Sequence, residues 1–178
     1  MRAYNLFHPD RYALQVLSTL LGGMMSSRMF LEVRERLGLA YYVATGAETN
    51  PDTGFLMTRA GVDNKNIKKA IQAILREYKK MSVKKPSEKE LKKAKDYLKG
   101  RTALSLETSE ELASFYGVQE ILRGETLTPA QILKQIEKVT VDDILRVAKD
   151  IFTPEKINLA LIGPFDGKKE LESLLLEV

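Results

Sequence analysis

The chain has 178 residues, of which 44% are hydrophobic and 29% charged, and its formal net charge is +4. These values suit one globular domain, residues 1–178, that can bury a core without disulfides or metals. The absence of cysteine excludes disulfide bonds, thiolate chemistry and cysteine–zinc sites.

The chain has a single histidine, His8, which limits the classes of active site that it can form. A catalytic zinc site ordinarily uses three protein ligands, nearly always including histidine, so an independent metal site is not expected here. A Ser-His-Asp triad would have to use His8, which lies beside Pro9. We interpret His8 as a turn residue ahead of the first helix.

We predict a cytoplasmic protein, because the sequence shows no targeting signal. The N-terminus shows no apolar run preceded by positive charge, and no stretch approaches the roughly 20 apolar residues of a membrane helix. The lysines between Lys65 and Lys99 are interleaved with glutamates and lack clustered aromatic residues. We therefore predict a solvated face, with neither nucleic acid nor a membrane as partner.

Two helices are predicted at the start of the chain. The first covers about residues 11–21, is capped by Asp10 and ends at a Gly-Gly pair. Ser26 or Ser27 caps the second through its side-chain oxygen, and Gly38 ends it as a left-handed residue. The apolar side chains of this second helix recur at three-to-four spacing, which predicts a buried face. They are Met29, Phe30, Val33 and Leu37.

Two strands follow. Residues 40–48 and 55–62 are rich in residues of high β propensity, and a polar segment from Asn50 to Gly54 separates them. This order predicts an antiparallel hairpin.

The second half of the chain is predicted to be mainly helical. Each helix begins at a recognisable cap, and two of the starts are capping boxes with glutamate at the third helical position. The expected starts are Asn64 or Asn66, Ser87-x-x-Glu90, Thr108-x-x-Glu111, Thr128-Pro129 and Thr140-x-x-Asp143. Residues 156–163 are apolar enough for a central strand, and a last helix is expected over about 167–176.

The element order is typical of an α+β fold, an antiparallel-rich mixed sheet with helices packed on it. Three strands make a thin sheet for this much helix, since such domains usually have four to six. Residues 1–4 are typical of the tail of a strand. We therefore expect the first strand of the sheet to be missing, which leaves a sheet edge or a gap inside the sheet unpaired.

Two segments resemble the pitrilysin family of zinc peptidases, to which insulin-degrading enzyme and the mitochondrial processing peptidase belong. They are HPDRYALQVLSTLLGGMMSSRMFLEVRERLGLAYYV and the downstream run from LSLETSEEL to VAKDIF. The resemblance covers about residues 6–165 and is to the second, non-catalytic domain. It implies a LuxS/MPP-like metallohydrolase fold in which two similar α+β halves enclose a chamber.

The resemblance also implies a site. One half of such proteins carries an inverted zinc motif, H-x-x-E-H. The other half has no metal ligand and supplies an arginine and a tyrosine that contact the substrate backbone. Those positions match Arg34 and Tyr41. The implied role of both is to stabilise negative charge on the scissile carbonyl oxygen, with zinc bound by the partner half rather than by this chain.

Simpler interpretations of the same residues remain. Arg34 can pair with Glu32 or Glu35, and Tyr41 or Tyr42 can fill the core. The Ser26-Ser27-Arg28 run can bind phosphate at a helix N-terminus, although capping is the better interpretation because no G-x-x-x-x-G-K accompanies it.

Three functional hypotheses follow. In the first, the chain is the substrate-binding half of a zinc metallopeptidase and is inactive alone, because it has no H-x-x-E-H. In the second, it is a structural or interaction module of the same fold, as in the core subunits of a respiratory cytochrome complex. In the third, it is an unrelated ligand-binding domain. We also predict that the isolated chain self-associates through the exposed sheet surface.

Overall fold

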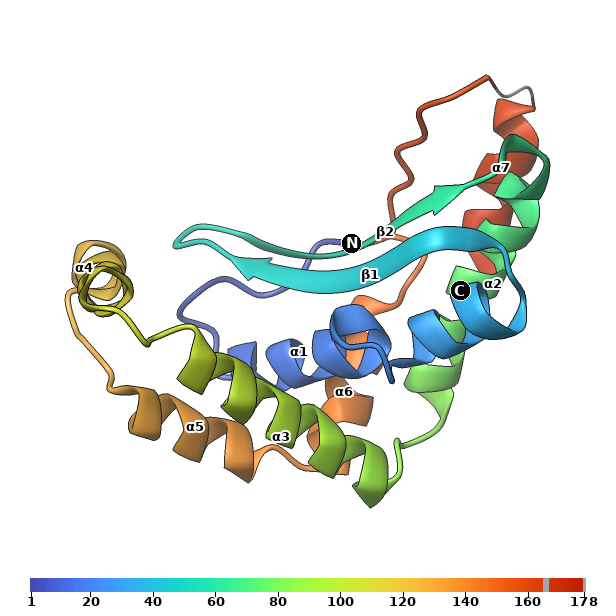
Figure 1. Ribbon diagram of the computed structural model, residues 1–178. Helices are drawn as coiled ribbons and strands as arrows, with labels where there is room; N and C mark the ends of the chain where they lie inside the picture. Colours follow the sequence, from blue (N-terminus) through green and yellow to red (C-terminus); the bar gives the residue numbers. More distant parts are fainter. Residues whose placement is uncertain (165–166, 178) are drawn as a thin grey trace.

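The computed structural model describes residues 1–164 and 167–177. A long β-hairpin lies over a central helix, a second layer of helices lies beneath that helix, and further helices stand at one end (Figure 1). This arrangement confirms the α+β class. The described sheet has two strands only, so the larger mixed sheet expected from the sequence is wrong for this part of the chain.

The central helix, α1, is the middle of the hydrophobic core. It spans Arg11–Ser18 and continues without a break into a π-helical turn, η1, over Thr19–Gly23. Its apolar side chains are almost completely buried because helices pack on several sides of it and the hairpin covers it from above. The most deeply buried are Leu14, Val16, Leu17, Leu20 and Leu21.

The hairpin has the predicted form. Strands β1 (Ala40–Thr49) and β2 (Gly54–Val62) pair antiparallel, with a register irregularity near Ala40. Thr45 and Thr58 lie opposite each other, and their hydroxyl oxygens are 2.7 Å apart. Helix α2 (Ile67–Val83) joins this pair, since the buried hydroxyl of Tyr78 donates to Thr58 Oγ1 at 2.5 Å. This hydrogen-bonded chain ties the hairpin to α2.

We expect Tyr78→Phe to lower the free energy of unfolding by about 1 kcal/mol, because the ring still packs while the hydrogen bond to Thr58 is lost. Chemical denaturation measures the change. Tyr97→Phe is the matched control, since Tyr97 lies partly exposed on α3 (Glu88–Leu104), and its effect should stay within about 0.5 kcal/mol. Equal effects of the two substitutions would contradict the role given to the Tyr78 hydroxyl.

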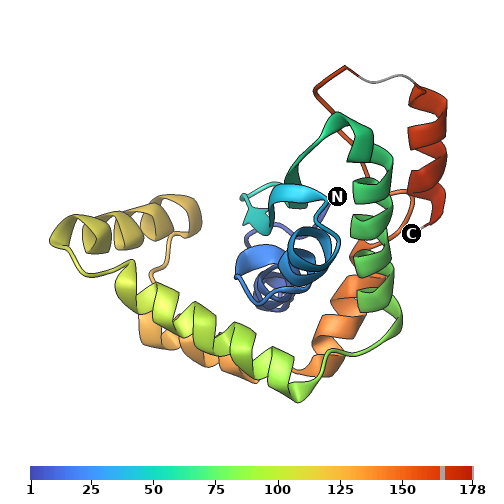
Figure 2. The same ribbon diagram turned by 45° about the vertical axis from the view of Figure 1, so that its right-hand side comes forward.

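Two further helices form the lower layer and a third projects from it. Helices α3 and α5 (Pro129–Lys138) pack beneath α1, while α4 (Ser109–Arg123) extends away from the rest of the molecule (Figure 2). No residue of α4 is buried. The capping boxes predicted at Ser87 and Thr108 are both present, and the helix starts predicted at Thr128 and Thr140 also form capping boxes.

The remaining helices are α6 (Val141–Ile151) and α7 (Lys168–Leu174), and short 3-10 turns span Asn64–Asn66 and Leu175–Glu177. Helix α6 packs on both α1 and α2. The segment before α7 corrects the sequence prediction, because residues 157–162 form no strand. They lack a neighbouring strand to pair with in the described structure, although their apolar pattern suits one.

Predicted side-chain caps are absent at three helices, including α2, where Asn66 makes no capping hydrogen bond. Asp10 makes no capping hydrogen bond at α1, because its carboxylate pairs with Arg146 of α6. The Ser27 hydroxyl is buried and has no hydrogen-bond partner among the described residues. Packing against the core, rather than these caps, therefore fixes where the first two helices begin.

His8 is a turn residue, as expected. Its ring stacks on Tyr4 with the centroids 3.8 Å apart, and its Nδ1 accepts a hydrogen bond from the Asp10 amide. Within residues 1–164 and 167–177, no group of three metal-ligating side chains is arranged to hold an ion, and no helix is long and apolar enough to cross a membrane.

Candidate functional site

The candidate site is a corner where a helix turns into β1. The helix ends in a π-helical stretch, η2, over Phe30–Arg36, and Gly38 follows with φ of +59°. Its backbone hydrogen bonds confirm the wide turn, since the Leu37 amide donates to the Glu32 carbonyl five residues earlier. Gly38 takes the left-handed conformation that the sequence predicted, and this lets the chain reverse into the strand.

The corner is supported from below by η1. A Cβ atom on Gly22 would lie 2.4 Å from the backbone nitrogen of Thr45, so only glycine lets this turn approach β1 so closely. Met29 and Val33 anchor η2 in the core, with no measurable exposure, whereas Leu37 is 38% exposed. The predicted buried face is therefore confirmed at Met29 and Val33, whereas Phe30 is only partly buried and Leu37 is exposed. Strand and helix are held rigidly together at this corner.

Arg34 lies on the solvent side of η2. Its side chain is 43% exposed, and its Nε is 3.9 Å from Glu35, a long and weak ion pair. The guanidinium lies over the Phe30 ring at 4.7 Å from the centroid. Such a cation–π contact contributes about 0.5–1 kcal/mol at an exposed site. Phe30 therefore orients Arg34 while leaving its N–H donors largely available.

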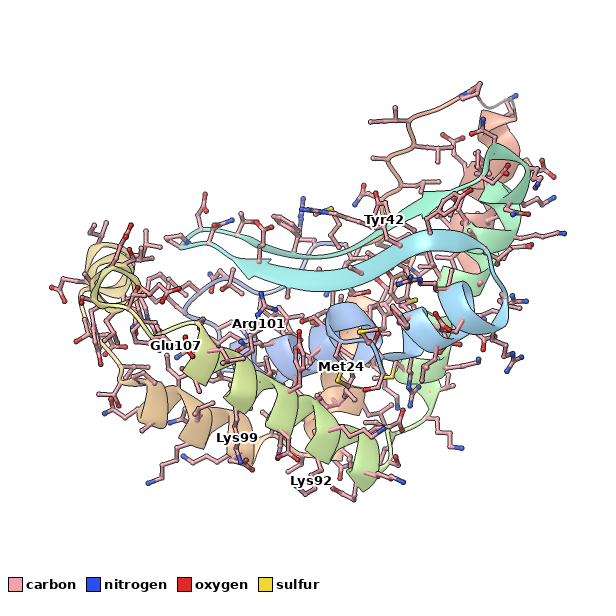
Figure 3. All side chains as sticks on the ribbon, viewed as in Figure 1. Met24, Tyr42, Lys92, Lys99, Arg101 and Glu107 are labelled. Atoms are coloured by element: carbon pink, nitrogen blue, oxygen red, sulfur yellow. The ribbon has the colours of Figure 1, made fainter. Side chains whose placement is uncertain are left out.

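Tyr41 is the second candidate. It is 81% exposed, and its side chain makes no hydrogen bond within the described structure. Tyr42 is also exposed, at 57%, and its ring covers Gly61 of β2. Figure 3 shows Tyr42 above the hairpin, on the side away from α1. The interpretation that Tyr41 or Tyr42 fills the core is therefore wrong.

Arg34 and Tyr41 lie on the same helix–strand corner but do not contact each other. In the part of the chain that the structure describes, no hydrogen bond joins them, and both side chains present donors to solvent from either side of Gly38. Glu32, the other carboxylate considered for Arg34, pairs with Arg36 instead at 3.3 Å. The corner thus offers a guanidinium and a phenol O–H that are both accessible to a ligand.

The preceding Ser-Ser-Arg run is a structural element. Arg28 forms a two-pronged ion pair with Glu90 of α3, with distances of 2.9 and 3.3 Å. Glu90 also closes the capping box of Ser87. The guanidinium is therefore engaged, which argues against phosphate binding here. This pair could not be predicted from the sequence, because its partners are 62 residues apart.

The Arg28–Glu90 pair predicts a pH-dependent contribution to stability. Burial raises the pKa of Glu90, but hydrogen bonds from Arg28 and Ser87 outweigh this and hold the pKa below its ordinary value of 4.5. Because the pKa is depressed in the folded state, the contribution is present above pH 4.5 and is lost as the pH falls. We expect Glu90→Gln to lower the denaturation midpoint at neutral pH more than at about pH 4. Glu88→Gln is the control, and an equal pH dependence in both variants would contradict the assignment.

The three methionines near the corner lie in different environments. Met29 is buried in the core, Met25 is 76% exposed, and Met24 is partly buried (Figure 3). Only Met25 can contribute fully to an adaptable contact surface.

Comparison with known proteins identifies the family to which the chain belongs. The family model described as the Peptidase M16 inactive domain matches residues 2–98, which include η1, η2 and the hairpin. The chain belongs to this family, the inactive domain of M16 peptidases, as its resemblance to pitrilysin-type proteins implied.

Individual relatives agree. A Streptomyces coelicolor protein named an uncharacterized zinc protease is 34% identical over 159 residues, which are 89% of this chain and 34% of that protein. A crystal structure of a conserved protein from Enterococcus faecalis matches with a TM-score of 0.70 and 30% identity, over 83% of this chain and 35% of that one. The chain thus spans about a third of the length of these relatives.

A more distant match shows the fold alone. Complex III2 from Candida albicans contains a chain that matches with a TM-score of 0.75 and 20% identity, over 84% of this chain and 38% of that one. The same fold therefore occurs in an assembly that its name does not describe as a protease.

Proposed function

We propose that this chain is the non-catalytic, substrate-binding half of a zinc-dependent metallopeptidase. The observation that carries the proposal is the exposure of Arg34 and Tyr41 on a rigid corner in an M16 inactive domain. The S. coelicolor relative is named a zinc protease and is about three times as long as the matched region. This supports the proposal that the metal is carried by a partner half outside the matched region. The chain itself has no H-x-x-E-H, so activity requires that partner.

The chemistry of the two side chains suits this role. Peptide hydrolysis develops negative charge on the carbonyl oxygen under attack, and zinc in the partner half polarises that carbonyl. A guanidinium and a phenol O–H are donors that stabilise such charge when they are held in place beforehand. Stacking on Phe30 and the short turn at Gly38 provide that orientation for Arg34 and Tyr41.

A structural or interaction module is the second candidate. The fold match to a chain of Complex III2 favours it, because the fold alone does not specify peptidase chemistry. The exposed helix α4, with Val118 at 54% and Ile121 at 83% exposure, also suits a protein that docks onto others. The two candidates differ in whether Arg34 and Tyr41 affect a reaction.

Reconstitution tests the proposal. The chain is assayed with zinc and a fluorogenic peptide, first alone and then with a homologous M16 half that carries H-x-x-E-H. We expect no hydrolysis by the chain alone and hydrolysis by the mixture above that of the catalytic half alone. If the two halves bind each other but the mixture gains no activity, the structural module is the correct function.

A further inference from the structure

The two arginines of η2 are held in different ways. Arg36 pairs with Glu32, one turn earlier, at 3.3 Å, and within the described structure it lies over no aromatic ring. Arg34 lies over the Phe30 ring at 4.7 Å from the centroid, and its Nε is 3.9 Å from Glu35. A carboxylate therefore holds Arg36, whereas an aromatic ring holds Arg34.

The Phe30 ring contributes little to the core. It is partly buried, but within the described chain it is not among the partly buried apolar side chains that pack against the core. Arg34 follows four residues later on the same side of the helix, where its guanidinium makes the cation–π contact. The ring therefore serves to hold Arg34 more than to pack the domain.

Glu35 is the competing partner. Its side chain is 57% exposed, and Arg34 is its one ion-pair partner among residues 1–164 and 167–177. Because both side chains are exposed and have several rotatable bonds, a change of rotamer can shorten the distance between them. A closer pair would withdraw N–H donors of Arg34 from a ligand. An exposed ion pair and an exposed cation–π contact are of similar strength, so the two partners are closely balanced.

We propose that Phe30 is a positioning residue that keeps Arg34 away from Glu35, so that these two neighbours regulate how available Arg34 is to substrate. The catalytic consequence rests on the proposed function, but the position of Arg34 can be measured without any reaction. Loss of the ring should shift the population of Arg34 toward Glu35 by about two- to fivefold, the equivalent of one exposed cation–π contact.

NMR spectroscopy of the 178-residue chain measures the position of Arg34. Protons held over an aromatic face are shifted upfield, so we expect the side-chain protons of Arg34 upfield of those of Arg36. In Phe30→Leu the Nε–H of Arg34 should move downfield as it donates to the Glu35 carboxylate. Adding Glu35→Gln to Phe30→Leu should abolish that downfield shift. Phe7→Leu, which removes an exposed ring elsewhere, is the control and should leave Arg34 unchanged.

Fluorinated phenylalanines at position 30 separate the charge distribution of the ring from its shape. Successive fluorine atoms weaken the negative face of the ring and change its size little. The kcat of the reconstituted peptidase should therefore fall step by step, to about two- to fivefold below wild type, with KM little changed. Phe30→Tyr should retain kcat, and Glu35→Gln should restore most of the loss in Phe30→Leu. A ring that only packs would give no such graded series.

The two measurements distinguish failure of this inference from failure of the proposed function. The inference is overturned if the wild-type Arg34 protons show no ring shift, or if Glu35→Gln has no effect in Phe30→Leu. A flat fluorine series in a mixture whose activity depends on Arg34 also overturns it and leaves the proposed function intact. If the spectra change as expected but the mixture gains no activity that depends on Arg34, the positioning by Phe30 stands and the proposed function fails.

Discussion

Arg34→Ala is expected to lower the kcat of the reconstituted peptidase by roughly 10²–10³-fold, the usual cost of removing one donor to a developing oxyanion. Because the donor acts mainly in the transition state, kcat/KM should fall by a similar factor while KM changes little. Tyr41→Phe should lower kcat by roughly 10²-fold for the same reason. Steady-state kinetics of the mixture measure all three constants.

Two neighbouring residues provide matched controls. Arg36 lies on the same helix with its side chain 73% exposed and pairs with Glu32, so Arg36→Ala should leave kcat within about twofold. Tyr42 adjoins Tyr41 and covers Gly61, so Tyr42→Phe should behave likewise. If Arg36→Ala were as damaging as Arg34→Ala, the effect would come from general charge or folding rather than from a specific donor.

The second large effect is expected at Gly22, which we predict to be essential for stability. Alanine there would place Cβ 2.4 Å from the Thr45 nitrogen and 2.5 Å from its hydroxyl oxygen, so η1 and β1 must separate. Such overpacking costs about 1–3 kcal/mol or more, which exceeds the roughly 0.5–1 kcal/mol that alanine gains over glycine in a helix. Thermal unfolding should show a clearly lowered midpoint.

Gly100 and Gly23 are the controls for this substitution. A Cβ on Gly100, in α3, meets nothing within 4 Å, so Gly100→Ala should stabilise by about 0.5–1 kcal/mol. A Cβ on Gly23 would be 3.5 Å from Thr19, an ordinary contact, and its replacement should be nearly neutral. A wild-type midpoint for Gly22→Ala would show that the corner is looser than the structure indicates.

Local signals predicted most of the secondary structure. The turn residues from Asn50 to Gly54 placed the hairpin, and four serine or threonine caps placed the starts of α3 to α6 within a residue. Gly38 adopts the left-handed conformation that was expected where its helix ends. Each of these features depends on neighbouring residues, which a single sequence contains in full.

Features that depend on distant partners could not be predicted in the same way. The strand expected at 156–163 has a suitable apolar pattern, but strand formation also needs a neighbour, and the pairing stops after Lys156. The Asp10 carboxylate was expected to cap α1, yet Arg146 of α6 competes for it. The π-helical turns in η1 and η2 shift the hydrogen bonding by one residue, which the apolar spacing does not reveal.

The candidate site was predicted only in part. The resemblance to the pitrilysin family selected Arg34 and Tyr41, and the structure adds that both side chains are accessible. The contact of Arg34 with Phe30 was not predicted, since Phe30 was assigned to the buried face of its helix. A helical residue four positions earlier lies on the same side as Arg34, which is the signal that would have suggested it.

The most direct test of the substrate-binding role is photocrosslinking from position 41. Tyr41 is replaced by p-benzoylphenylalanine, and the chain is combined with the zinc-bearing half and a peptide substrate before irradiation. Mass spectrometry then identifies what is attached. We predict a crosslink to the peptide from position 41 and much less from the same group at Tyr42. A crosslink only to the catalytic half, or none while the two halves are bound, would contradict a substrate-contacting role for this corner.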